Sequence, residues 1–187
     1  MSTGSELVDA AQELAAAIKD AAVQPGDAMR LLSILAVNVP PDPATSSAIG
    51  SAMALVQHAT GDMFRRAAVV ALARASAAYQ PTSVEDAAAV RDAVCALLDA
   101  EITIAGDQGQ DATFNALREV RSAVSLDLAT RGAGLASIIT VTSVQPVPAP
   151  VLAQRLYRKP GRADELVGQA NPIHPAFMPT SFKARSS

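Results

Sequence analysis

The sequence predicts a mainly α-helical protein: a bundle of four to five helices, then a short extended segment and a small C-terminal appendage. Three observations lead to this fold class. Half of the 187 residues are apolar, mostly Ala, Val and Leu, and only 3% are aromatic, a composition that favours closely packed helices. Capping boxes and Gly or Pro breaks divide the apolar stripes into helix-sized segments. A Pro-rich stretch then precedes an end of different composition.

Two helices are expected in the first forty residues. The capping box Thr3-Gly4-Ser5-Glu6 begins the first helix, and Pro25-Gly26 ends it. Asp27 can cap the second, which the Pro40-Pro41 pair stops. The expected inward-facing residues are Leu7, Ala11, Leu14 and Ile18 in the first helix and Leu31, Leu32, Ile34 and Leu35 in the second.

A long third helix is expected from Asp42-Pro43 to about Ala78. Asp at the cap and Pro at the first helical position form a good start signal, and Gln80-Pro81 marks the end. Gly61 lies in the middle, so one continuous helix and two helices broken there are both possible. We favour the single helix.

Two further helices complete the expected bundle over residues 1–134. The capping box Thr82-Ser83-Val84-Glu85 begins the fourth, with Gly106 as its C′ residue, and the fifth runs from about Asp111 to Gly132. Short connections between such helices are typical of a bundle. The inward-facing residues are Val90, Val94, Leu97, Leu98 and Ile102 in the fourth helix and Phe114, Leu117, Val120, Val124 and Leu128 in the fifth.

The pattern changes after Gly134. Residues 137–144 are rich in β-branched side chains and predict an extended or strand-like segment, and three prolines follow within residues 145–150. We therefore expect an extended Pro-rich linker over 135–150 and a small docking module over 151–187. Within the module, short helices are expected at Val151–Tyr157 and Arg162–Gln169, followed by an extended Pro-rich ending.

The charges are unevenly distributed. Residues 1–150 hold 9 basic and 16 acidic side chains, a net of −7, whereas residues 151–187 hold 6 basic and 2 acidic side chains, a net of +4. A nucleic-acid-binding domain should carry a clustered basic face, so direct nucleic-acid binding is not expected of the acidic body. Cys95 is the single cysteine, which excludes an intrachain disulfide. We expect neither a signal peptide nor a membrane-spanning segment.

No catalytic pattern is recognisable. The two histidines, His58 and His174, have no neighbouring Cys or His at metal-ligand spacing. Asp107 and Asp111 flank a Gly-containing loop, but the dense acidic series of a calcium loop is missing. We therefore expect no enzymatic activity, no catalytic residue, no cofactor and no metal.

The C-terminal segment is the most specific part of the sequence. It contains, in one ungapped register, Val151-Leu152-Ala153, Arg155-Leu156-Tyr157, Arg162-Ala163, Glu165-Leu166-Val167, His174-Pro175, Phe177 and Pro179. This series resembles the C-terminal end of the DNA circularisation (circulation) proteins of Mu-like phages and prophages, and the preceding helices are loosely similar to that family's middle region. The family's usual amino-terminal domain has no counterpart here. Arg158-Lys159 replaces the family's Gly-Asp, and Asn171 lies one position away from the family's Asn.

The resemblance implies a structural role in a phage tail tip or baseplate hub. It implies contacts with hub, tape-measure and tube proteins, a symmetric homo-oligomer of three or six copies, and location in the virion tail after assembly in the host cytoplasm. The expected docking residues are Arg155, Leu156, Tyr157, Arg162, Leu166, His174, Pro175, Phe177 and Pro179.

The same segment resembles a degenerate lysin motif. In that case Leu156, Tyr157, Leu166 and Val167 should pack together as a small core, with Phe177 covering them. The alternative function is then a module that binds peptidoglycan or nucleic acid through the basic C-terminal segment. Loss of the Gly-Asp pair argues against a sugar-binding groove.

Overall fold

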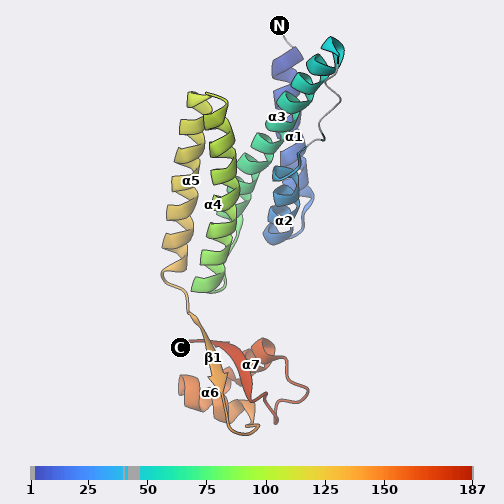
Figure 1. Cartoon of the computed structure of the whole chain (residues 1–187). Coiled ribbons are helices and arrows are strands. Elements are labelled where there is room, and N and C mark those ends of the chain that lie inside the picture. The colour runs from blue at the N-terminus through green and yellow to red at the C-terminus, as the bar shows by residue number, and fades with distance from the viewer. Residues whose placement is uncertain (1–2, 40, 42–46, 187) are drawn as a thin grey trace. The chain divides into compact units, whose positions relative to one another are not determined.

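The computed structural model of the chain describes residues 3–39, 41 and 47–186. Over this part of the chain it contains seven α-helices, one short 3-10 helix and one two-stranded antiparallel sheet (Figure 1). The expected mainly α-helical fold with a small appendage is confirmed. The chain divides into two compact units, a helical unit of residues 1–80 and 89–129 and a C-terminal unit of residues 81–88 and 130–187.

The helical unit consists of three packed helices and a helical hairpin (Figure 1). The three are α1 (Thr3–Ala21), α2 (Pro25–Ala36) and α3 (Ala48–Ala78), and the hairpin is formed by α4 (Val84–Asp107) and α5 (Asp111–Gly132), which both extend into the C-terminal unit. All five helices contribute to one apolar core. Its most buried large side chains are Leu32, Val69, Leu72, Val94, Leu98 and Leu128.

Helices α1 and α3 contribute mainly alanine side chains to this core. On α1, Ala11 and Ala15 are almost fully buried, whereas Leu7 and Leu14 are nearly half exposed. The prediction that Leu7 and Leu14 face inward was therefore wrong. Small side chains let helix backbones approach closely, and α3 contributes a matching set to the same core. That set is Ala67, Ala68, Ala71 and Ala75.

The second helix begins earlier than expected. Gln24 is the N-cap and Pro25 the first helical residue, so Asp27 is a first-turn residue and not the cap. Leu32 is buried and Leu35 is partly buried, but Leu31 and Ile34 are exposed, contrary to expectation.

The long helix α3 is continuous through Gly61, which confirms the single-helix prediction. The expected start at Asp42-Pro43 lies outside the described residues, as does the side chain of Thr3 in the first capping box. In the described chain α3 begins at Ala48, where the Ser47 hydroxyl accepts a hydrogen bond from the Gly50 amide at 3.0 Å.

The capping interactions of α4 are displaced from the predicted positions. Ser83, not Thr82, caps the helix, because its hydroxyl accepts from the Asp86 amide at 3.1 Å. The Asp86 carboxylate in turn accepts from the Thr82 amide at 2.8 Å. At the other end Gly109, not Gly106, adopts the left-handed conformation, with φ of 67°. The Gln110 amide then bonds the Ala105 carbonyl, as in a Schellman motif.

A buried ion-pair cluster joins α3 to α4. The Glu101 carboxylate accepts from the Arg65 guanidinium at 3.2 Å and from the Arg66 guanidinium at 2.8 Å, and Arg65 also pairs with Asp62. Glu101 is only 2% exposed and Arg65 only 7%. The cluster holds two cations and two anions, so its buried charges are compensated.

The C-terminal unit has the element order strand, helix, helix, strand. It contains β1 (Ile138–Thr142), α6 (Ala149–Tyr157), the 3-10 turn η1 (Pro160–Arg162), α7 (Ala163–Ala170) and β2 (Ser181–Arg185). The strands pair antiparallel, with Ile138 opposite Arg185 and Thr142 opposite Ser181. The segment expected to be a linker therefore contributes a strand to this unit. A second apolar core lies here, formed by Val141, Ala149, Leu152, Ala153, Tyr157, Leu166, Met178, Phe182 and Ala184.

Two contacts connect the start of α4 with the end of α5 and β1 inside the same unit. A Cβ added at Gly132 would lie 2.8 Å from that of Ala87, so the helices approach closely enough there to require glycine. The Glu85 carboxylate accepts from the Ile138 amide at 2.9 Å. This backbone hydrogen bond is the main reason why the pKa of Glu85 is lowered.

Replacing Glu101 by Ala should lower the free energy of unfolding by about 3 kcal/mol or more, because Arg65 then stays buried with half of its counter-charge missing. Asp99→Ala is the matched control, since Asp99 lies on the same helix and pairs with Arg121 at a half-exposed site. It should cost far less. Urea unfolding followed by circular dichroism measures both variants. Equal losses in the two would contradict a special role for the buried cluster.

Candidate docking site

The predicted docking residues separate into a buried and an exposed group. Leu166 is fully buried, Tyr157 is buried, and Leu156 packs against them from a half-buried position, so the expected small core exists. The Tyr157 hydroxyl donates to the Arg185 carbonyl at 2.9 Å and so connects α6 to β2. Burial raises the pKa of this phenol, which keeps it protonated as a donor. These residues hold the module together.

Arg162 stiffens the turn between the two short helices. Its guanidinium carbon lies 3.8 Å from the centroid of the Tyr157 ring, within cation–π range. The same guanidinium donates two hydrogen bonds to the Glu165 carboxylate, at 2.8 and 3.0 Å. This ion pair is the largest cause of the lowered pKa of Glu165. Arg162 therefore orders the module from a half-buried position.

The loop of residues 171–180, here called the docking loop, is held by backbone hydrogen bonds. The amides of Ala149 and Ser143 donate to carbonyls of the loop, at Pro175 (2.9 Å) and at Thr180 (2.8 Å). The Met178 amide donates to the Val147 carbonyl at 3.3 Å. The Met178 side chain is fully buried in the core of the unit. The loop thus has a defined conformation although it lacks regular secondary structure.

Two large apolar side chains project from the docking loop. Phe177 is 70% exposed and Ile173 is fully exposed. The prediction that Phe177 covers the small core was wrong, because the next residue, Met178, fills that position. The exposed His174 ring lies 6.1 Å from the Phe177 ring, and its Nδ1 accepts from the Ala176 amide at 3.1 Å. The surface is therefore an aromatic and aliphatic pair beside an imidazole.

Arg158 occupies a backbone position that suits glycine. Its φ of 55° and ψ of 23° lie in the left-handed region, where it forms the C-cap of α6. The family pattern described above has Gly at this position. Asn171, with φ of 43°, ends α7 in the same way, and Asn tolerates this conformation well.

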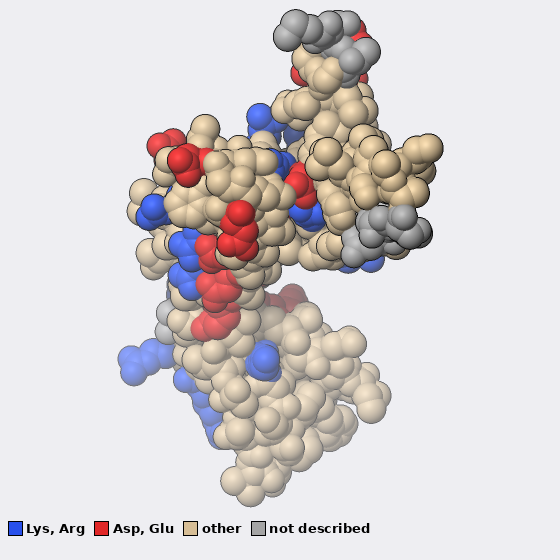
Figure 2. Space-filling view, turned by 45° about the horizontal axis from the view of Figure 1, so that its top comes forward, with Lys and Arg blue, Asp and Glu red and all other residues tan. Residues whose placement is uncertain are grey.

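The C-terminal unit carries a positive net charge. It contains seven basic and four acidic side chains, a net of +3, whereas the helical unit contains eight basic and fourteen acidic, a net of −6. On the face seen in Figure 2, the C-terminal unit at the bottom of the view shows isolated blue side chains on a largely uncharged surface. The exposed basic residues of this unit are Arg155, Arg158, Lys159, Lys183 and Arg185.

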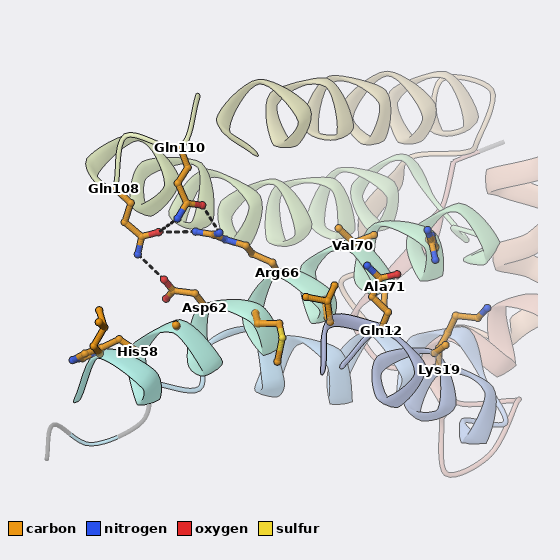
Figure 3. Close-up of a pocket in the computed structure, with 16 residues that line it drawn as sticks. Gln12, Lys19, His58, Asp62, Arg66, Val70, Ala71, Gln108 and Gln110 are labelled. Atoms are coloured by element: carbon orange, nitrogen blue, oxygen red, sulfur yellow. Dashed lines mark hydrogen bonds between the residues drawn. The ribbon is translucent and has the colours of Figure 1, made fainter. Parts of the chain in front are cut away.

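The helical unit has a separate groove between α1 and α3, with a volume of about 620 Å³ (Figure 3). Three of its polar side chains bind one another, since Arg66 donates to Gln108 at 2.7 Å and Gln108 donates to Asp62 at 2.6 Å. Lys19 also lines it and pairs with Asp20 at 3.2 Å. The volume is in the range of small-molecule sites, but Asp62, Arg66 and Gln108 already bind one another.

The described residues lack two further features. No group of three or more His, Cys, Asp and Glu in them is arranged to hold a metal ion. None of the described helices combines the length and apolar character needed to cross a membrane. Cys95 is buried, and desolvation raises the pKa of its thiol.

Comparison with known proteins adds no relative. No protein-family model matches the chain, and no curated protein matches it.

The remaining expected docking residues occupy the surface of the module, and sequence reasoning missed two others. Arg155 and Pro175 are exposed, and Pro179 is half-buried. Ile173 was missed as an exposed apolar residue, and Met178 was missed as the anchor of the loop. No periodic pattern identifies Met178 as the anchor, whereas the alternation of Phe182 and Ala184 was the available signal for β2.

Arg158→Gly should stabilise the C-terminal unit by up to about 1 kcal/mol, because glycine adopts the left-handed conformation without steric cost. Lys159→Gly is the control. Lys159 has φ of −138°, and glycine there should cost about 0.5 to 1 kcal/mol. Amide hydrogen exchange of residues 138–185 reports the local change. Destabilisation by Arg158→Gly would contradict the assigned backbone conformation.

The C-terminal unit should lose stability in acid partly through Glu165. Its folded-state pKa lies below the ordinary value of 4.5, so its contribution is complete above that value and is lost as the pH falls through the folded pKa. Glu165→Gln should flatten this dependence in amide exchange of α7 measured below about pH 5. Asp164→Asn, the same kind of change at the neighbouring carboxylate, is the matched control, because no ion pair of Asp164 is described. An unaltered profile in Glu165→Gln contradicts the prediction.

Proposed function

We propose that this protein is a structural, non-enzymatic component of the tail tip or baseplate hub of a phage or phage-like particle, related to the DNA circularisation proteins. The helical unit forms a symmetric homo-oligomer, of three or six copies. The C-terminal unit docks on a neighbouring tail protein such as the hub, tape-measure or tube protein.

The observation that carries the proposal is the ordered docking loop with Phe177 and Ile173 exposed. An aromatic side chain held outward by a fixed backbone loses little conformational entropy on binding, which is the property of an interface anchor. Three backbone hydrogen bonds and the buried Met178 hold the loop before any partner is present. A loop of this kind suits permanent docking in an assembly.

The backbone at Arg158 supports the family relationship. The family pattern has glycine after the Tyr, and this chain keeps the left-handed conformation that glycine favours although Arg now occupies the position. Leu156, Tyr157 and Leu166, which belong to the series on which the resemblance rests, also pack in one apolar cluster.

The positive charge of the C-terminal unit favours the alternative function, binding of an anionic polymer. Five exposed basic side chains could contact phosphates of a nucleic acid or of a cell-wall polymer. Binding of the full-length chain to cell-wall sacculi, or a DNA mobility shift that weakens with salt, would support this alternative.

Mass spectrometry of purified particles tests the structural role. The protein should be present in them at a copy number divisible by three. Absence from particles, when the chain is abundant in the lysate that produced them, would reject the proposal.

Phe177→Ala should reduce incorporation into particles at least about tenfold, since truncating an aromatic anchor costs about 2 kcal/mol of binding. Val144→Ala is the matched control, because Val144 is fully exposed on the same unit but lies outside the docking loop. It should be incorporated normally. If both variants enter particles as well as the wild type, the docking loop is not the contact.

A further inference from the structure

The first turns of α3 leave large apolar side chains in solvent. Ile49, Met53 and Val56 are 75%, 60% and 65% exposed, although they belong to the same helix whose later turns form the core. In this first half of α3 Ala54 is buried, whereas all the helix's other buried residues lie from Gly61 onward. An exposed apolar patch of this kind marks an interaction surface.

The three side chains form one stripe. Their spacings of four and three residues place them on the same face of the helix, as in the seam of a coiled coil. Leu55 is equally exposed, but it lies about a third of a turn or more away and lines the groove between α1 and α3. Leu55 is therefore an exposed apolar residue of the same helix that lies outside the stripe.

The surface between these side chains is hollowed. The hollow is lined by Ile49, Ala52, Met53 and Val56, with Ala48 and Gln57 at its edges. The first four stand at positions i, i+3, i+4 and i+7, which is the set of residues that accepts one side chain of a facing helix in knobs-into-holes packing. The small Ala52 leaves the hollow open. The geometry fits a helix as occupant.

The charge distribution favours a second copy of this chain as the owner of that helix. Residues 48–60 contain no Asp, Glu, Lys or Arg, whereas the helical unit as a whole has a net charge of −6. Two identical stripes can therefore meet without burying a charge, but contacts elsewhere would bring acidic surfaces together. On the face seen in Figure 2, the part built from α1, α2 and α3, at the upper right, is largely uncharged, and red and blue side chains gather over α4 and α5.

We propose that the stripe of Ile49, Met53 and Val56 is a homotypic contact, in which the first turns of α3 from neighbouring copies pack together around the symmetry axis of the oligomer. This inference rests on the proposed assembly into a symmetric oligomer and names the surface that forms it. Closed rotational symmetry brings the same stripe of every copy to one axis.

Light scattering coupled to size exclusion on the full-length chain tests the proposal. The wild type should be oligomeric, and Met53→Glu should weaken association by more than about a hundredfold, since it places an unpaired carboxylate in each copy of the seam. Leu55→Glu, the same change at an equally exposed position of the same helix, should associate like the wild type. Circular dichroism checks that both variants remain folded.

Cross-linking provides a second measurement. Met53 lies in the middle of the stripe, so the rotational symmetry brings it beside its own counterparts in the neighbouring copies. Met53→Cys should form a disulfide-linked dimer under mild oxidation, and Leu55→Cys should not. The native Cys95 is buried, and the wild type with this cysteine alone gives the background level of cross-linking.

A monomeric wild type, or equal effects of the Met53 and Leu55 substitutions, overturns the inference. These outcomes are distinguishable from failure of the proposed function. A chain that is monomeric yet present in particles rejects only the homotypic stripe. A chain whose oligomer depends on Met53 but which is absent from particles supports the stripe and rejects the tail role.

Discussion

The arrangement of the helical unit depends on the carboxylate of Glu101. Alanine-lined helices bury little apolar area per residue, and alanine surfaces can slide past one another with little change in packing energy. The cluster removes this freedom, because Arg65 and Arg66 on α3 meet Glu101 on α4 only in one register. A displaced register would leave buried charges unpaired, which costs several kcal/mol. We infer that the cluster contributes specificity of packing more than net stability.

The sequence predicted most helices because their signals are local. The capping sequence before Val84, Pro25 and the closing Gly132 each act over one turn, so the positions of the helices were correct within a few residues. The sequence did not predict which side chains are buried or paired where this depends on residues far away in the chain. Leu7 and Leu14 look like core residues, but both are nearly half exposed, and the smaller Ala11 and Ala15 are buried instead. The pairing of Arg65 with Glu101 joins residues 36 positions apart, which no local pattern reveals.

The sequence allowed the small core of the C-terminal unit to be expected. It did not show which side chain of the docking loop points inward. The resemblance to a lysin motif grouped Leu156, Tyr157 and Leu166 as a small core, and these side chains do lie in one apolar cluster. Phe177 and Met178 are neighbours in a Pro-rich loop, where no periodicity decides which of them points inward. Backbone hydrogen bonds to residues about thirty positions earlier decide it. The strand β2 was missed because it is short and rich in basic residues, and its pairing partner lies beyond the whole helical part of the module.

The pairing of β1 with β2 also sets an order of events during synthesis. Ile138 emerges from the ribosome long before Arg185, its partner in the sheet. Until residues 181–185 are synthesised, the apolar core of the C-terminal unit lacks Phe182 and Ala184, and β1 has no partner strand. Helices of the helical unit, whose contacts are complete by residue 129, can fold earlier. The surface with Phe177 therefore forms last, after the contacts of the helical unit are complete.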